Sequence, residues 1–184
     1  MKWKGIFLII IVSIYVACNY NEDSLVQTAA RWVPTTDNMG SSFSHNGDLI
    51  QNGIISVDFT LTQISDSSPW ASLICYIGHD LQGLEGFTIS YKSDENLTVS
   101  LHQADFGYSG NRTYSHYQAQ LPSAAIWRSR TVYFNDFQQP EWTPDESKNI
   151  PYIAENVNAF HFSPNINPET GGTANVQIRY LQLF

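Results

Sequence analysis

The sequence predicts an all-β fold, an antiparallel β-sandwich of the jelly-roll type, and three observations lead to this prediction. At least five segments alternate apolar and polar residues with a period of two, the pattern of a strand with one buried face. Turn residues, above all Gly, Asn, Asp and Ser, separate these segments. Helical periodicity is almost absent from residue 31 onward. Short strands separated by turns are typical of two packed antiparallel sheets rather than of a parallel α/β sheet.

The strands can be placed one by one from their alternation. The clearest is 54–63, in which the apolar residues Ile55, Val57, Phe59 and Leu61 alternate with polar ones. The further strands expected are 70–78, 87–92, 97–102, 114–121, 127–134, 157–163 and 174–183. Helix is expected only as short pieces, for example near 151–155. No internal repeat is visible, so we expect one β-sandwich domain over 31–184.

The N-terminus has the layout of a secretory signal. Lys2 and Lys4 precede an apolar run over 5–16, which is too short to span a bilayer comfortably. The run ends at Val16-Ala17-Cys18, which resembles the bacterial lipobox, although Tyr15 stands where leucine is usual.

This resemblance implies that residues 1–17 are a lipoprotein signal peptide, that Cys18 is lipidated, and that residues 18–30 form a tether. A simple signal peptide cut near Ala17 and an uncleaved anchor are the alternatives. In every case the folded part is expected outside the cytoplasm, in the cell envelope, facing the periplasm or the extracellular side.

Composition narrows the class of partner. The formal net charge is −8 and becomes about −10 when Lys2 and Lys4 are removed, which disfavours nucleic acid as a partner. Aromatic residues make up 14% of the chain and charged residues only 14%, a balance typical of extracellular β-rich modules that bind neutral ligands. Cys75 lies in the apolar run 73–77, so we expect a small buried core side chain rather than a nucleophile. If Cys18 carries lipid, Cys75 has no disulfide partner.

Recognisable catalytic motifs are absent from the sequence. It contains no G-x-S-x-G, H-E-x-x-H or C-x-x-C motif and no phosphate-binding glycine loop. The five histidines are scattered, and zinc binding would need His102, His116 and His161 to converge. Nothing singles out a catalytic pair among the acids that glycoside hydrolysis would use, which are Asp58, Asp80, Asp105, Asp136 and Glu141. We therefore expect no enzyme, with a small polysaccharide-active hydrolase or esterase as the less favoured alternative.

Alternation also separates two sheet faces. Ten apolar residues are expected in the core: Phe87, Ile89, Tyr91, Val99, Leu101, Val132, Phe134, Phe137, Phe160 and Phe162. Trp127 is expected to plug the core or its rim. The opposite phase gives a polar, aromatic and nearly uncharged set that includes Thr88, Ser90 and Ser100. Within this set and the adjoining loop, the expected ligand-binding residues are Tyr76, His102, His116, Gln118, Tyr133, Trp142 and His161. Tyr76 and Tyr133 are expected to stack on sugar rings on one concave face, with Trp142 as a lid.

Two longer stretches resemble a known family. Residues 80–92, DLQGLEGFTISYK, and 127–142, WRSRTVYFNDFQQPEW, are similar in order to motifs of the family 11 carbohydrate-binding modules. The same order occurs in the wider galactose-binding-like sandwich that includes the complex I intermediate-associated group. The resemblance runs from about Trp32 to Leu183. In one departure, Ile178 is followed by Arg179 where the final strand of the family often carries an Ile-Asp pair, so the role of that aspartate is not carried over.

The resemblance implies a galactose-binding-like sandwich that binds a β-glucan or another plant-type polysaccharide at the bacterial cell surface without catalysis. A structural or assembly lipoprotein that holds a protein partner is the alternative. Related sandwiches often hold a structural calcium ion near the first and last strands, where Asp37, Asp48 and Asp58 are the available acids. Arg179 would oppose a cation near the last strand. No other cofactor is expected.

Overall fold

A computed structural model describes residues 24–27, 31–37, 39–63, 68–103 and 116–184. Eleven strands and three short 3₁₀ turns make up the regular structure of these residues. The strands are β1 Arg31–Thr36, β2 Ser42–Ser44, β3 Ile50–Gln51, β4 Ile54–Leu61, β5 Ala71–Tyr76, β6 Gly86–Ser93, β7 Leu97–Gln103, β8 Gln118–Leu121, β9 Ala124–Tyr133, β10 Val157–Pro164 and β11 Gly172–Leu183. The turns are η1 Phe134–Asp136, η2 Asp145–Ser147 and η3 Ala154–Asn156. The described residues contain no helix long and apolar enough to cross a membrane.

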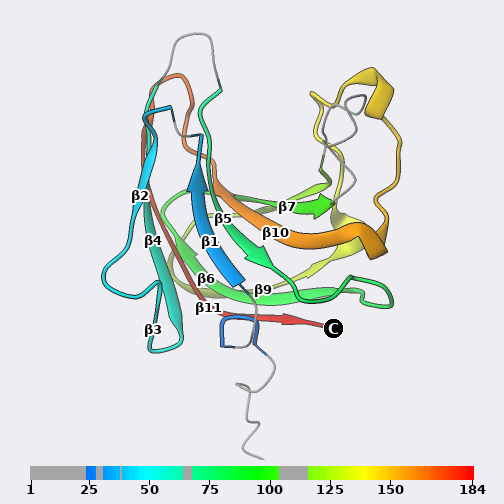
Figure 1. Cartoon of the computed structure of the whole chain (residues 1–184), viewed down its shortest axis with the longest axis horizontal. Coiled ribbons are helices and arrows are strands. Elements are labelled where there is room, and N and C mark those ends of the chain that lie inside the picture. Colours follow the sequence, from blue (N-terminus) through cyan, green and yellow to red (C-terminus); the bar gives the residue numbers. More distant parts are fainter. Residues whose placement is uncertain (1–23, 28–30, 38, 64–67, 104–115) are drawn as a thin grey trace, which may run out of the picture.

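The strands form two antiparallel sheets that pack face to face (Figure 1). Sheet A has the order β1-β5-β10-β7-β8. Sheet B has the order β2-β4-β11-β6-β9, with β3 also paired to β4. Strands that are neighbours in space are mostly distant in sequence, since β10 lies between β5 and β7 and β11 lies between β4 and β6. The predicted antiparallel β-sandwich is therefore confirmed.

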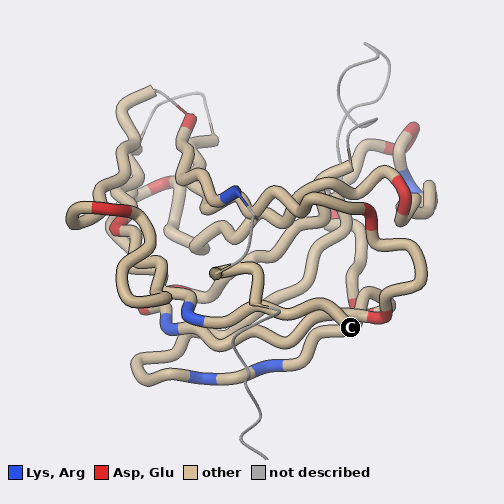
Figure 2. Tube along the Cα trace, turned by 60° about the horizontal axis from the view of Figure 1, so that its bottom comes forward, with Lys and Arg blue, Asp and Glu red and all other residues tan. Residues whose placement is uncertain are grey.

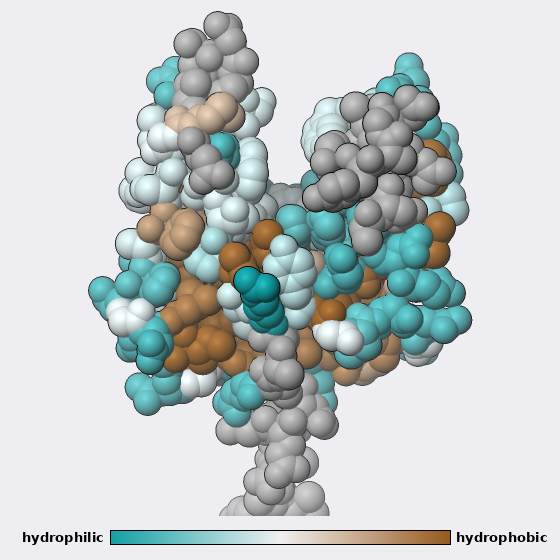
Figure 3. All heavy atoms as spheres, viewed as in Figure 1, coloured by the Kyte–Doolittle hydropathy of each residue, from teal (hydrophilic) through white to brown (hydrophobic). Residues whose placement is uncertain are grey.

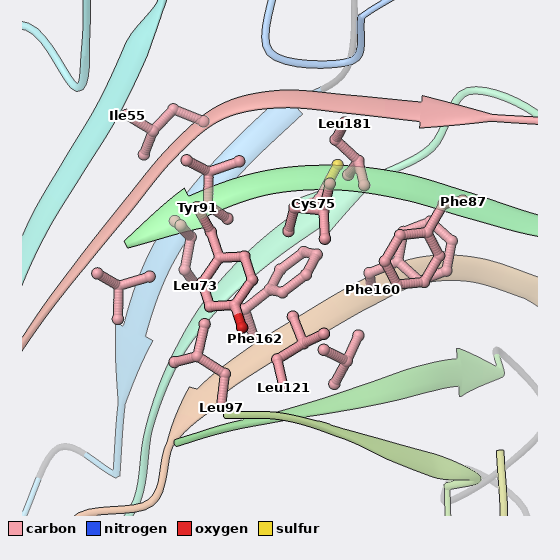
Figure 4. Close-up of a cluster of buried hydrophobic side chains, with 14 of the residues drawn as sticks. Ile55, Leu73, Cys75, Phe87, Tyr91, Leu97, Leu121, Phe160, Phe162 and Leu181 are labelled. Carbon is pink, nitrogen blue, oxygen red and sulfur yellow. The ribbon is translucent and has the colours of Figure 1, made fainter. Parts of the chain in front are cut away.

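The core lies between the sheets and is rich in aromatic rings (Figure 4). The Phe160 ring centroid lies 5.3 Å from that of Phe87 and 6.3 Å from that of Phe134. Trp32 of β1 stacks on Phe162 with ring centroids 5.9 Å apart. All ten residues expected in the core are buried.

Two buried polar groups show how the core accommodates them. The Tyr91 hydroxyl donates to the carbonyl oxygen of Pro122 at 2.6 Å, so its phenol is satisfied inside the sandwich. Cys75 is a free, buried cysteine, and burial raises the pKa of its thiol. Cys75 is therefore the small core side chain that the sequence predicts and is unsuited to act as a nucleophile.

Boundaries differ from the expected ones at a few strands. The strand expected at 127–134 begins earlier, at Ala124, and Phe134 already belongs to η1. The helical piece expected near 151–155 is the single turn η3. Of the segment expected at 114–121, Gln118–Leu121 forms β8, whereas Tyr114 lies outside the described residues.

Candidate functional site

The molecule is hollowed on the side of sheet A that faces away from sheet B (Figure 3). Two projections rise on either side of the hollow, and β10 and β7 cross its bottom between them (Figure 1). One projection holds the ends of β1 and β10, and the other holds the segment that follows η1. We call this hollow the groove. Its floor is the outer face of sheet A.

The strand registers define the side chains of the floor. Residues on neighbouring strands that pair directly point to the same face of a sheet. One row across all five strands consists of Val33, Ile74, His161, Ser100 and Gln118. The next row consists of Arg31, Tyr76, Ala159 and His102. Apart from Arg31 at its end, the floor in these rows is uncharged.

Three imidazole rings cluster in the floor. The His102 and His161 rings stack with centroids 4.9 Å apart and planes 10° apart. The His116 ring centroid lies 5.0 Å from that of His102 and 6.3 Å from that of His161. Residues that are scattered in the sequence converge because β7 and β10 are neighbours and His116 lies two residues before β8, the neighbour of β7.

The environment keeps two of these rings neutral. Burial lowers the pKa of His161 to about 3, and the nearby His102 and His116 act in the same direction. Burial also lowers the pKa of His116 to about 4, supported by His102 and opposed by a hydrogen bond with the backbone of Leu101. His102 Nδ1 donates to Asn158 Oδ1 at 2.9 Å, which links β7 to β10 at this point. At neutral pH His116 and His161 therefore offer neutral hydrogen-bonding groups.

Asp37 stabilises the first of these projections, where β1 ends and β5 begins. Its carboxylate accepts hydrogen bonds from the backbone N–H of Met39 and Trp70 and from the Ser41 hydroxyl, at 2.7, 3.0 and 2.8 Å. Burial acts to raise the pKa of Asp37, but these hydrogen bonds outweigh burial and lower it. Trp70, whose backbone is fixed in this way, is 49% exposed and directly precedes β5, the strand that ends at Tyr76.

Sequence reasoning did not include Trp70 among the site residues. The signal was its spacing: Trp70, Ser72, Ile74 and Tyr76 are two residues apart, so all four share the outer phase. Trp70 places an exposed indole at one side of the groove.

Two side-chain amides stabilise the opposite projection, that of the buried Gln103 and that of the half-buried Gln139. Gln139 Nε2 donates to the carbonyl oxygen of Ser147 at 2.8 Å, while its Oε1 accepts from the N–H of Asn149 at 2.8 Å. Gln103 Oε1 accepts from the N–H of Ile153 at 2.6 Å. The same segment carries Trp142, which is 64% exposed. Each side of the groove therefore carries one exposed tryptophan.

Five of the seven expected ligand-binding residues meet on the outer face of sheet A or directly beside it: Tyr76, His102, His116, Gln118 and His161. Trp142 lies on the adjoining projection, as expected for a residue at the rim.

The expectation that Tyr133 lies on the same face as Tyr76 is wrong. Tyr133 pairs with Gly86 in sheet B, and its ring packs edge-on against Phe184 at 5.8 Å. Thr88 and Ser90 belong to β6 of the same sheet. Alternation assigned the correct face of each strand, but it could not tell which of the two sheets a strand joins. Tyr133 therefore does not share a face with Tyr76.

The position of Trp127 also differs from the expected one. Trp127 lies half-buried in sheet B outside the core, and its ring is covered by two cations. The bulge between Tyr91 and Ser93 in the β6–β9 pairing lies next to it. The expected core or rim plug is thus a platform on the outer side of sheet B.

The described residues include no group of three or more His, Cys, Asp or Glu side chains arranged to hold a metal ion. The histidine cluster packs ring on ring. Asp48 and Asp58 line a shallow pocket of about 250 Å³, and the Asp58 carboxylate accepts from Asn175 Nδ2 at 2.7 Å. Calcium binding stays a prediction from the sequence. Asp105, named above as a candidate acid, lies outside the described residues, as does Cys18.

No protein-family model matches the chain, and no curated protein matches it. Its structure does match solved ones. The family 11 carbohydrate-binding module of the cellulosomal cellulase Lic26A-Cel5E of Clostridium thermocellum matches with a TM-score of 0.60 and 13% identity, covering 85% of this chain and 92% of that one. The fold is that of a family 11 carbohydrate-binding module.

A second structure of a Clostridium thermocellum family 11 module is a complex with a β-1,3-1,4-mixed-linked tetrasaccharide. It matches with a TM-score of 0.56 and 13% identity and covers 80% of this chain and 87% of that one. A solution structure of the module CtCBM11 matches with a TM-score of 0.53 and 14% identity over 84% of this chain and 88% of that one. At these identities the likeness is one of fold, and it agrees with the family 11 resemblance of the sequence motifs.

Proposed function

We propose that this chain is a non-catalytic carbohydrate-binding protein and that the groove is its binding site. One observation carries the proposal. The floor of the groove presents a phenol, three clustered imidazoles and an amide in register across neighbouring strands, and an exposed tryptophan stands at each side. This equipment suits a neutral polyhydroxyl ligand, because sugar C–H faces stack on aromatic rings and hydroxyl groups exchange hydrogen bonds with imidazole and amide groups.

The ligand class we propose is a β-linked glucan or another plant-type polysaccharide. A row of floor residues crosses all five strands of sheet A, so several consecutive sugar units can each meet a different strand. His161 at the centre of that row makes no hydrogen bond within the described part of the chain, which leaves its nitrogens for sugar hydroxyls. A family 11 module of the same fold was solved with a mixed-linked tetrasaccharide, which supports this choice.

Tyr76→Ala is expected to weaken binding of a soluble mixed-linkage β-glucan about tenfold, because the ring stacking lost is worth about 1.4 kcal/mol. Tyr76 is 40% exposed, so the fold is expected to survive the change. Isothermal titration or affinity gel electrophoresis measures the effect.

Tyr133→Ala is the matched control. Tyr133 is 48% exposed but lies in sheet B, so its replacement is expected to leave affinity unchanged. Loss of binding in Tyr133→Ala with full binding in Tyr76→Ala would place the site on the other sheet. A parent protein that binds none of a panel of neutral glycans would contradict the proposed function.

We further propose that the protein is anchored at the bacterial cell surface by lipid on Cys18. Cys18→Ser, expressed in the native host, is expected to abolish partition into membranes and to give a soluble or unprocessed form. Membrane fractionation and the mass of the mature N-terminus measure this. Unchanged membrane association with normal cleavage would show that Cys18 is not the anchor.

A further inference from the structure

Two arginines on the edge strand β9 lie on the inner side of sheet B. Arg128 is paired with the buried Tyr91 and Arg130 with the buried Ile89, so both share the phase that faces sheet A. The two positions are about 7 Å apart along the strand. Both side chains are nevertheless exposed, so sheet A leaves this part of β9 uncovered. We call Arg128 and Arg130 the arginine pair.

A pocket of about 400 Å³ opens between the edges of the two sheets at this point. Gln120 and Pro122 line it from the side of sheet A, whereas Arg130 and Asp136 line it from β9 and η1. The Tyr91 hydroxyl reaches the same place from inside the sandwich, because it donates to the Pro122 carbonyl oxygen at 2.6 Å. The pocket thus lies where the open side of the sandwich meets the arginine pair.

Both guanidinium groups lie near the Tyr91 hydroxyl. Burial raises the pKa of Tyr91, while Arg128 and Arg130 act to lower it through their charge and through hydrogen bonding. Because the net effect raises this pKa, the hydroxyl is uncharged at neutral pH and compensates neither cation. Two cations that act on one hydroxyl can also act together on one anion in the adjoining pocket.

The described residues form no ion pair with either member of the arginine pair. Their ion pair joins Lys148 to Asp145, on the projection beside the groove. Asp136 lines the pocket together with Arg130, and one carboxylate leaves two guanidinium groups with a net positive charge. Figure 2 shows the basic segments mostly at the lower side of the molecule, whereas most acidic segments lie elsewhere. Salt screens those acids, since attraction and repulsion fade beyond roughly 8 Å.

Protection of the sheet edge accounts for only part of this arrangement. Inward-pointing charges on an edge strand prevent edge-to-edge association, and β9 is an edge strand. A single charge already serves that purpose, whereas two arginines side by side repel each other. An anion in contact with both guanidinium groups removes this repulsion. Edge protection predicts self-association when the charges are removed, whereas anion binding predicts the loss of a ligand.

The pocket continues the floor of the groove. The row of floor residues next to that of His161 includes Ser163, Thr98 and Gln120. Gln120 Nε2 donates to Thr98 Oγ1 at 2.9 Å, and Gln120 Oε1 accepts from Asn165 Nδ2 at 3.0 Å. Gln120 is therefore a fixed amide that borders both the floor and the pocket. A glycan that crosses sheet A along this row leaves the sheet beside Arg130.

We propose that the arginine pair is a carboxylate subsite for a uronic acid unit of the glycan that lies in the groove. A guanidinium group binds a carboxylate through two parallel hydrogen bonds, a geometry that a single sugar hydroxyl does not offer. An acidic peptide also carries carboxylates, but it lacks sugar rings for Tyr76 and Trp70 to stack on. The inference rests on the proposed carbohydrate-binding function and adds a substrate class to it, namely β-linked polysaccharides that carry uronic acid units.

Arginine side-chain NMR tests the subsite without the groove. Residues 18–184 carrying Cys18→Ser retain every described contact, because the described residues begin at Ser24. Sodium glucuronate is expected to shift the Nε–Hε signals of Arg128 and Arg130, which the variants R128Q and R130Q assign. The uncharged methyl ester of glucuronic acid is expected to leave these signals in place. No shift, or an equal shift of the Arg179 signal on the outer face of sheet B, would contradict the subsite.

Two forms of one polysaccharide test the substrate class. The probes are a soluble mixed-linkage β-glucan and the same glucan after oxidation of a small share of its C6 hydroxyl groups to carboxylates. The parent is expected to bind the oxidised form about tenfold more tightly, and this preference should shrink as NaCl is raised. In R128Q/R130Q the preference is expected to disappear, while affinity for the neutral form stays that of the parent.

The control is Lys148→Gln, which removes an exposed cation outside the pocket and is expected to keep the preference. Tyr76→Ala should weaken binding of both forms, so failure of the groove and failure of the subsite are distinguishable. If R128Q/R130Q does not fold, the single variant R130Q is expected to lose most of the preference, because Arg130 lines the pocket.

Four results would overturn the proposal. Equal binding of both glucans by the parent would show that no carboxylate is recognised, and binding of neither would overturn the substrate class together with the proposed function. A preference that survives in R128Q/R130Q, with self-association of that variant in size-exclusion chromatography, would leave the arginine pair with edge protection alone. Tighter binding of oligoglutamate than of the oxidised glucan would assign the pair to an acidic peptide.

Discussion

Replacing Phe160 with Ala is expected to lower the free energy of unfolding by about 3–5 kcal/mol. Phe160 is fully buried, and its ring lies within 6.4 Å of the Phe87, Phe134 and Phe162 rings, centroid to centroid. Both sheets therefore lose contacts at one point, and the rigid strands around the cavity can close it only in part. Urea denaturation followed by tryptophan fluorescence measures the change.

The neighbouring residue provides the control. His161 follows Phe160 on β10 and points to the opposite face, into the groove. His161→Ala is expected to cost less than about 1 kcal/mol at neutral pH, typical of a residue outside the core. It should nevertheless weaken glycan binding. Equal destabilisation by the two variants would contradict the assignment of inner and outer faces on this strand.

Acidification from about pH 7 to about pH 5 is expected to lower the free energy of unfolding by at least about 2 kcal/mol. Burial holds the pKa values of His161 and His116 at about 3 and about 4, below the ordinary value of 6.5. Between the ordinary value and these low values the unfolded chain binds more protons than the folded one. Stability is therefore fully present above about pH 6.5 and is lost progressively as the pH falls below it.

Denaturation midpoints at the two pH values test this expectation, since the lowered pKa of Asp37 keeps that carboxyl ionised in this range. The double variant His116→Gln, His161→Gln should lose most of the pH dependence. His45→Gln, which replaces an exposed histidine in a loop, should retain it. A free energy of unfolding that is equal at the two pH values would show that the cluster is not held neutral by its surroundings. In the folded protein His116 and His161 stay neutral over this range, so their acceptor nitrogens remain available to a glycan.

The alternation of residues predicted the inner and outer faces of the strands well. Phe160 and His161 are adjacent and were assigned to opposite faces, as the structure confirms. The prediction succeeds because side chains of a strand alternate between faces whatever the strand is paired with. Tyr76 and Gln118 were grouped for the same reason, and they lie on the same face of sheet A.

The failures share one physical cause. Tyr133 has the outer phase of its strand, but β9 pairs with β6 in sheet B, so the outer face of β9 is on the other side of the molecule from the groove. Strand pairing depends on long-range contacts and not on the pattern within one strand. Trp127 was expected to plug the core or its rim because it stands at the entry of its predicted strand, yet Lys92 and Arg179, from two other strands, cover its ring on the outside.

The sequence alone determined the class of fold, the faces of most strands and the buried, unreactive state of Cys75, because each depends on local periodicity and on the transfer of apolar groups out of water. Only the tertiary structure decided that three distant histidines form one cluster, that Trp70 flanks the groove and that Lys92 and Arg179 lie over the Trp127 ring. These features depend on the order of strands in the two sheets. That order is set by which pairings let both sheets bury their apolar faces at once, and no local pattern records it.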